Sequence, residues 1–237
     1  MYIIHYVDMK KEKINNDIQF AILATDVAIL TLRNDELYIK LINVDRPPYF
    51  VGIGGLPGGL VAPKETALDA ATRHSKEKAH IDPEKLHMEQ LYTFSDVNRD
   101  PRGRVVSVGY LALVPWDSLS VSEQKDTKET WWAKAIMSKK LAYDHNRIID
   151  MAISRLRSRI TYTTLISKIL PKEFTLTELE KSFESVLGKD IDKRNFRKKI
   201  EKLGILKELD KMRRGQKHRP ASLYSFKSAS VREIDVL

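Results

Sequence analysis

The stretch Gly52–Ile81 reads GIGGLPGGLVAPKETALDAATRHSKEKAHI, and its two halves differ sharply in composition. Residues 52–59 contain five of the chain's ten glycines, which indicates backbone with positive φ or a close approach between backbone and a ligand. Residues 64–79 have the composition of a helix. On that helix positions 74, 77 and 78 share one face, because they are three and four residues apart. The stretch therefore predicts a glycine-rich loop followed by a helix.

The composition excludes several classes of protein. The 237 residues include 42% hydrophobic residues, enough to bury a core in one or two domains. There is no cysteine, which removes disulfides, thiolate metal sites and thiol nucleophiles. No apolar run approaches the roughly 18–20 residues of a membrane span, and residues 1–13 lack the apolar core of a signal peptide. We expect a cytoplasmic protein without membrane contact.

Positive charge is concentrated near the end of the chain. The net charge is +9, from 41 lysines and arginines against 32 acidic residues. Residues 161–237 hold 18 basic and 11 acidic residues, and residues 1–160 hold 23 and 21. Residues 189–219 alone hold 13 basic and 5 acidic residues. This density is typical of a surface that binds phosphates, with a solvated basic face as the alternative.

The first part of the chain alternates strand-like segments with loops. The predicted strands are 20–32, 37–44, 88–94, 104–114 and the segment around Trp131 and Trp132. From Asp144 the apolar residues follow helical spacing, which predicts an amphipathic helix that ends near Arg159 and connects two domains.

The last third has the pattern of a winged helix-turn-helix domain. Three helices are predicted: Tyr162–Leu170, one that begins after Thr175 and ends at Gly188, and Lys193–Leu203. Two strands, 205–210 and 222–226, flank a basic loop. The domain prediction is therefore 1–143 for the first domain, 144–160 for the connecting helix and 161–237 for the winged helix.

The glycine-rich segment and its helix resemble the Nudix box. The matching residues are Gly59, Glu65, Arg73, Glu77 and Ile81, and the departures are His74, Ser75, Lys78 and His80. In Nudix hydrolases the helix presents carboxylates that bind Mg²⁺ or Mn²⁺ against a diphosphate. Three carboxylates would suit a hard divalent cation, whereas this face carries an imidazole, one carboxylate and an ammonium. We therefore predict a diphosphate pocket kept for binding, with hydrolysis weakened or lost. The prediction includes no catalytic residue, no metal site and no cofactor, with Mg²⁺ only where some hydrolysis persists.

Four further motifs resemble one branch of the Nudix proteins. They are Arg99–Val108 (RDPRGRVVSV), Leu141–His145 (LAYDH), Asp192–Lys199 (DKRNFRKK) and Arg219–Tyr224 (RPASLY). That branch is the Nudix-related transcriptional regulators of NAD metabolism (NrtR-like). The resemblance implies an α+β fold, a Nudix α/β/α sandwich with a mixed sheet, followed by a winged helix. It also implies a homodimeric repressor of NAD cofactor genes whose effector is ADP-ribose or a related nucleoside-diphosphate compound.

Two sets of candidate residues follow. The ligand-binding candidates are Arg46, Gly58, Gly59, Arg73, Glu77, Lys78, Arg99, Asp100, Arg102 and Arg104. The DNA-binding candidates are Lys193, Arg194, Asn195, Arg197, Lys198, Arg213, Arg214, Lys217 and Arg219. Arg194 and Arg197 are expected nearest the base edges, because arginine binds guanine bidentately, and the partner is expected to be double-stranded DNA with a palindromic operator. His145 is expected to cap or pack.

Two alternatives remain open at this point. The chain could be an active Nudix hydrolase of a nucleoside-diphosphate derivative with a regulatory C-terminal domain. The winged helix could instead bind a protein partner. In the main interpretation, the ligand shifts a population between two domain arrangements and so changes the fit to the operator.

Overall fold

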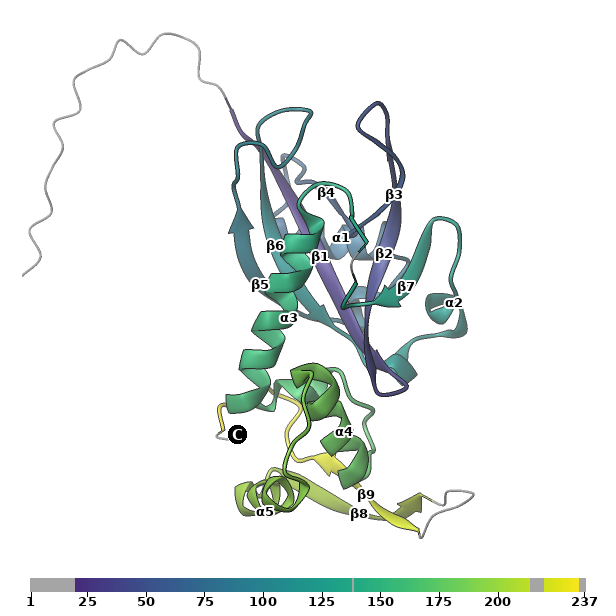
Figure 1. Cartoon of the computed structure of the whole chain (residues 1–237), viewed down its shortest axis with the longest axis vertical. Helices are drawn as coiled ribbons and strands as arrows, with labels where there is room; N and C mark the ends of the chain where they lie inside the picture. Colours follow the sequence, from purple (N-terminus) through teal and green to yellow (C-terminus); the bar gives the residue numbers. More distant parts are fainter. Residues whose placement is uncertain (1–19, 138, 214–219, 235–237) are drawn as a thin grey trace, which may run out of the picture.

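The first domain is built on a mixed seven-stranded sheet (Figure 1). The computed structural model describes residues 20–137, 139–213 and 220–234. The strands are β1 (Ile22–Arg33), β2 (Glu36–Arg46), β3 (Phe50–Gly55), β4 (Gly58–Leu60), β5 (His87–Phe94), β6 (Val105–Leu113) and β7 (Thr130–Lys134). The main order is β3-β2-β1-β6-β5, with β4 paired to β1 and β7 to β2. Only the β1–β6 pair is parallel among the strand pairs of the described residues.

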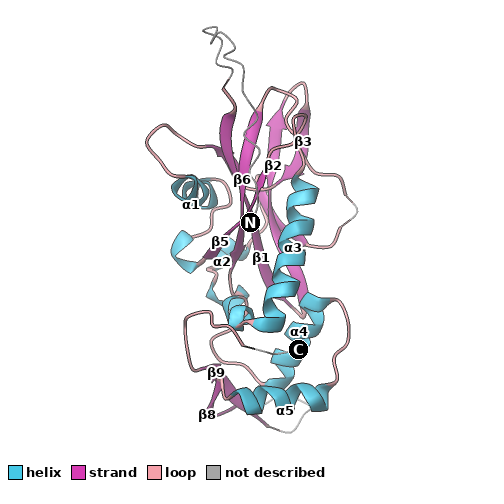
Figure 2. Cartoon of the chain, turned by 90° about the vertical axis from the view of Figure 1, so that its left-hand side faces the viewer, coloured by secondary structure: helices cyan, strands magenta, loops and turns pink. Residues whose placement is uncertain are grey.

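A helix covers each face of this sheet (Figure 2). Side chains alternate along β1, so that Val27 and Ile29 join the core beside α1 (Ala67–Glu77), whereas Ala28 and Leu30 join the core beside α3 (His145–Tyr162). This double burial explains why β1 is a near-continuous apolar run. Three short helical segments complete the domain: η1 (Pro83–Lys85), η2 (Trp116–Ser118) and α2 (Val121–Gln124).

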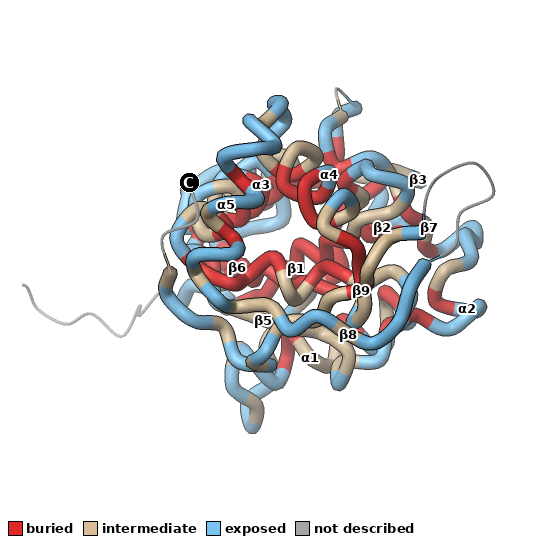
Figure 3. Tube along the Cα trace, turned by 90° about the horizontal axis from the view of Figure 1, so that it is seen from below, coloured by how far each residue is buried: buried red, intermediate tan, exposed pale blue. Residues whose placement is uncertain are grey.

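The winged helix lies beyond the end of α3 (Figure 1). It comprises η3 (Thr164–Lys168), α4 (Leu176–Leu187), α5 (Lys193–Leu203) and the hairpin β8 (Leu206–Arg213) with β9 (Ala221–Phe226). Capping follows the sequence: Thr175 begins α4 with a capping box, and Gly188 ends it in a left-handed conformation. Viewed from below, β8 is exposed along most of its length while β1 and β6 are buried (Figure 3).

Two predictions about local structure were wrong. Residues 52–59 are mostly strand, in β3 and β4, and not a loop. Gly58 serves close packing, since a Cβ there would collide with Asp26, whereas Gly52 has open space around it and a φ of 62°. Residues 162–170 do not form a separate α-helix: α3 continues to Tyr162, extended Thr163 interrupts it, and a 3-10 turn follows.

The winged helix packs directly on the first domain. One buried apolar cluster runs from the sheet through α3 into α4 and α5. The β1–β2 turn also contacts α4, where Lys181 Nζ lies 2.9 Å from Asp35 Oδ2 and Ser185 Oγ donates to the Asp35 carbonyl. Arg157 on α3 donates to the Val186 carbonyl at 2.8 Å. α3 is therefore a core helix shared by both parts. Within the described residues, no helix has both the length and the apolar composition to cross a membrane.

Candidate functional site

A cavity of about 460 Å³ opens where β1, β2, β4 and the end of α1 meet the loop after β5 and the start of α3. Of the ten predicted ligand-binding residues, eight line it: Arg46, Gly58, Gly59, Glu77, Lys78, Arg99, Asp100 and Arg102. Arg73 and Arg104 are outside it. Arg104 instead donates to the carbonyls of Ser95 and Asp96. The tertiary structure thus brings residues from four separate segments of the sequence to one cavity, whose role in binding stays a prediction.

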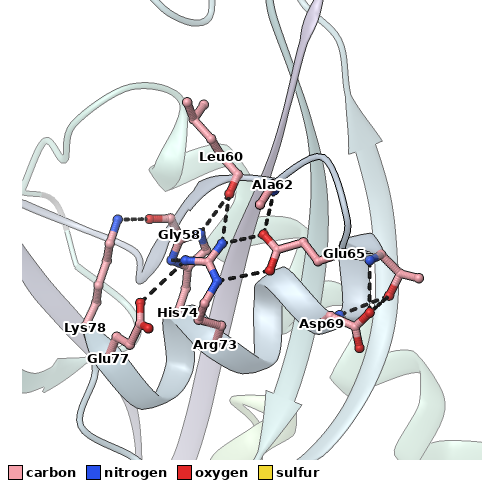
Figure 4. Close-up of polar contacts among 10 residues, drawn as sticks. Gly58, Leu60, Ala62, Glu65, Asp69, Arg73, His74, Glu77 and Lys78 are labelled. Carbon is pink, nitrogen blue, oxygen red and sulfur yellow. Dashed lines mark hydrogen bonds and ion pairs between the residues drawn. The ribbon is translucent and has the colours of Figure 1, made fainter.

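The Glu65–Arg73 pair fixes the segment before α1 (Figure 4). Arg73 Nε donates to Glu65 Oε2 at 3.0 Å, its Nη2 donates to the Leu60 carbonyl at 3.2 Å, and Ala62 N–H donates to Glu65 Oε1 at 2.6 Å. The hydrogen bonds from Arg73 and Ala62 lower the pKa of Glu65 to about 2. These two box residues therefore hold β4 and its following loop on the helix and do not reach the cavity.

His74 and Lys78 occupy the helix face where carboxylates were expected in a hydrolase (Figure 4). Lys78 Nζ donates to the Gly58 carbonyl at 2.5 Å, and His74 Nε2 lies 3.3 Å from the Leu60 carbonyl. Burial, reinforced by the Lys78 charge, lowers the pKa of His74. Burial and then the Arg46 charge lower the pKa of Lys78.

This face does not fit a divalent cation. The remaining carboxylate, Glu77, has a 58% exposed side chain and pairs with Arg73 at 3.5 Å. In the part of the chain that the structure describes, no group of three acidic, histidine or cysteine residues could hold a metal ion. The Lys78 ammonium lies against the Gly58 carbonyl, so a cation placed there would meet a positive charge. The protein itself supplies positive charge and hydrogen-bond donors at this site, which would suit a diphosphate.

A buried ionic cluster forms the inner wall of the cavity, and sequence analysis did not predict it. Arg99 donates from Nη2 to Asp26 Oδ2 at 3.0 Å, and from Nη2 and Nε to the two oxygens of Asp144 at 2.7 and 3.1 Å. Ser107 Oγ donates to Asp26 at 2.7 Å. The one signal for Asp26 was a lone carboxylate inside an otherwise apolar strand.

His145 belongs to the same cluster. Its Nδ1 accepts the Leu56 N–H at 2.9 Å, which assigns the neutral tautomer with a proton on Nε2, 3.3 Å from Asp26 Oδ1. Burial alone would raise the pKa of Asp26, but His145, Arg99 and Ser107 lower it well below its usual range. The Asp26 carboxylate is therefore charged and held from three sides.

α5 carries the expected basic surface. Phe196 and Ile200 are buried against the domain, while Lys193, Arg194, Asn195 and Lys198 are exposed. Asn195 also donates to the capping Asp192. The exposed residues give α5 a face suited to phosphates, and their contact with DNA stays a prediction.

Arg197 has an intramolecular partner that the sequence did not predict. Its guanidinium is bidentate on Glu180 of α4, with Nε near Oε1 and Nη2 3.1 Å from Oε2, and Nη2 also donates to Thr177 at 3.3 Å. The Glu180 side chain is 1% exposed. These bonds use the Nε and Nη2 edge of the guanidinium, so Arg197 holds α5 on α4 through that edge, and its contact with a base stays a prediction.

The β8–β9 hairpin is the wing of the winged helix, and the structure describes it in part. Arg213 pairs with Glu178 and donates to the Glu173 carbonyl at 3.2 Å, so this predicted DNA contact has intramolecular partners. Arg214, Lys217 and Arg219 lie outside the described residues.

Comparison with known proteins matches both parts of the chain. Residues 23–150 match the NUDIX domain family and residues 166–226 match the NrtR DNA-binding winged helix domain. The chain is 32% identical over 214 residues, 89% of its length and 84% of the relative's, to the ADPR responsive transcriptional repressor NtrR of Acinetobacter baylyi. It is 33% identical over 123 residues, 52% of its length and 70% of the relative's, to the ADP-ribose pyrophosphatase of Methanocaldococcus jannaschii.

Solved structures of one further relative extend the comparison. Shewanella oneidensis NrtR complexed with a 27mer DNA superposes with a TM-score of 0.76 at 30% identity, over 86% of this chain and 93% of that one. The NUDIX domain of the same protein complexed with ADP ribose gives a TM-score of 0.51 at 28% identity, over 60% of this chain and 92% of that one. The predicted fold, a Nudix sandwich followed by a winged helix, is confirmed, and the chain belongs to the NrtR family.

Proposed function

We propose that this chain is a transcriptional repressor that binds operator DNA through its winged helix and responds to ADP-ribose bound in the Nudix cavity. The observation that carries the proposal is the joining of two sites in one packed unit. A cavity lined by Arg46, Lys78, Arg99 and Arg102 suits a diphosphate, and a helix with an exposed basic face suits a duplex. The relatives whose names specify a repressor, DNA and ADP-ribose support this assignment.

The cavity acts in this proposal as a sensor and not as an enzyme. Efficient hydrolysis of a diphosphate by metal ions needs oxygen ligands on the helix face, and the chain presents His74 and Lys78 there. Positive charge supplied by the protein binds the ground state of the ligand without activating water. The effector is therefore released unchanged.

The expected assembly follows from the DNA. A homodimer would present two α5 helices to the half-sites of a palindromic operator, about one duplex turn apart. Control of NAD cofactor genes and a cytoplasmic location are parts of the same proposal.

A direct test measures operator binding with and without effector. We expect the full chain to bind duplex DNA from its own upstream region in a fluorescence anisotropy titration, and ADP-ribose to weaken that binding. Matched titrations with AMP and ribose 5-phosphate, which lack the diphosphate, should have little effect. Failure of ADP-ribose to change the operator affinity would overturn the sensor role, and failure to bind any upstream DNA would overturn the repressor role.

The alternative is an ADP-ribose hydrolase, which the similarity to the Methanocaldococcus enzyme favours. Incubation of the chain with ADP-ribose and Mg²⁺ decides between them, with AMP release measured by chromatography. Turnover on the scale of ordinary enzymes, roughly 1 s⁻¹ or more, would support the alternative. A His74→Glu, Lys78→Glu double variant is assayed beside wild type, because it supplies two carboxylates to the helix face. Metal-dependent AMP release by this variant alone would show that these two residues account for the missing activity.

A further inference from the structure

The cluster around Arg99 joins the cavity to Asp144, the N-cap residue of α3. Arg99 lines the cavity, yet its side chain is 3% exposed and is held by two carboxylates, Asp26 from β1 and Asp144 from the α3 N-terminus. Its Nη1 makes no hydrogen bond among the described residues. Arg99 thus has donor capacity left for an anion while it holds α3 against β1.

The carboxylate of Asp144 is used in an unusual way. Asp144 occupies the N-cap position of α3, where an aspartate usually accepts a hydrogen bond from an N–H of the first helical turn. Here it makes no such bond, and both its oxygens accept from Arg99. Asp144 therefore has two competing uses, as a partner of Arg99 and as the cap of its own helix.

The two carboxylates are not held equally. Asp26 is also bound by Ser107 and faces His145, within a central strand. The Asp144 side chain has Arg99 as its sole partner among the described residues. An anion that approaches Arg99 would repel both carboxylates, and Asp144 is the one free to leave.

Tyr143, the residue before Asp144, gives the start of α3 a second contact with the cavity. Tyr143 lines the cavity, has a φ of 53°, and packs its ring 4.4 Å from the ring of Phe50. A left-handed conformation is unfavourable for a non-glycine residue, so the surrounding packing must maintain it. A ligand that disturbs this packing would favour a rearranged α3 N-terminus.

We propose that Arg99 exchanges Asp144 for the diphosphate of the ligand, and that the released Asp144 then caps α3. The proposal rests on the proposed function and deepens it, because it identifies how the cavity communicates with the winged helix. β1, which carries Asp26, runs from the cavity to the β1–β2 turn that contacts α4, and α3, whose N-cap is Asp144, runs from the cavity to its own contact with α4 (Figure 1). Release of the Arg99 bond to Asp144 removes one link between β1 and the start of α3, while the contact of His145 with Asp26 remains as the pivot between them. Their contacts on α4 transmit the change to the winged helix.

The first test is the variant Asp144→Asn in the full chain. Asparagine caps a helix as well as aspartate but binds Arg99 without charge. We expect ADP-ribose to bind this variant at least as tightly as wild type in isothermal titration calorimetry, because the competing carboxylate is gone. We expect the fold-change that ADP-ribose causes in operator affinity to fall to less than a third of the wild-type value. Asp150→Asn, an exposed change on the same helix, is the matched control and should keep the wild-type fold-change.

The outcomes distinguish failure of the exchange at Arg99 from failure of the proposed function. Weaker ADP-ribose binding by Asp144→Asn, or an unchanged fold-change, overturns the exchange. Absence of any ADP-ribose effect in wild type overturns the proposed function instead.

A second measurement needs neither operator nor variant. Inorganic pyrophosphate, a bare diphosphate, should bind wild type in calorimetry and slow hydrogen exchange of the amides of Asn146 and Arg147, the second and third residues of α3, from which a capping side chain accepts. No binding, or binding without a change in those amides, contradicts the exchange.

Discussion

The pair between Arg197 and Glu180 allows a sharp prediction about the winged helix. Arg197→Ala removes the partner of a carboxylate whose side chain is 1% exposed. Breaking a buried ion pair by removing one partner costs about 3–5 kcal/mol. The Arg197 side chain is 49% exposed, so water can reach the vacated space, and we discount the loss to about 2 kcal/mol. That loss corresponds to roughly a 30-fold shift in the ratio of folded to unfolded molecules.

The assay must report on the C-terminal helices. The three tryptophans, Trp116, Trp131 and Trp132, lie in the first domain, so their fluorescence does not report directly on a local change in α5. Native-state hydrogen exchange of the α4 and α5 amides gives the local free energy of unfolding. The Arg197→Ala variant should lower it by about 2 kcal/mol.

Two variants complete the experiment. Arg197→Met with Glu180→Leu removes both charges and should recover most of the lost stability. Arg194→Ala, an exposed change on α5, should weaken operator binding with no loss of stability. Wild-type stability of Arg197→Ala together with a loss of operator affinity would refute the structural role of Arg197, since Arg197 would then act on DNA directly.

Three further predictions concern other parts of the chain. Lys198→Ala should weaken operator binding and reduce the slope of log affinity against log salt by about one, as measured by anisotropy at several salt concentrations. Lys40 is buried beside the Trp132 ring. Burial lowers the pKa of Lys40 to about 8, although the charges of Asp126 and Glu123 act in the opposite direction. Between pH 8 and pH 10.5 the unfolded chain binds more protons than the folded chain. The free energy of unfolding of wild type relative to Lys40→Met should therefore rise over this range by up to about 3 kcal/mol. Urea titrations at several pH values measure this difference, and a difference that does not change with pH would contradict the prediction. Glu65, whose pKa is about 2 because of Arg73, should stabilise wild type relative to Glu65→Gln above about pH 4.5, with the advantage lost as the pH falls towards 2 in acid unfolding curves.

The sequence by itself determined the order of most elements and the chemical character of both sites. Period-two and period-3.6 patterns, with caps such as Thr175 and Gly188, are local signals, and they placed most strands and helices within a few residues. The departures His74 and Lys78 were visible in the box, because the residue types themselves decide the charge on that helix face.

Tertiary structure alone decided which charged residues pair. Asp26, Arg99 and Asp144 are far apart in the chain, and only the packing of β1, the loop after β5 and α3 brings them within hydrogen-bond distance. Arg197 has the helical position and side chain of a DNA contact, yet α4 places buried Glu180 against it. Local patterns report which face of an element is apolar. They do not report which partner fills a particular position across an interface, because that depends on contacts between segments distant in sequence.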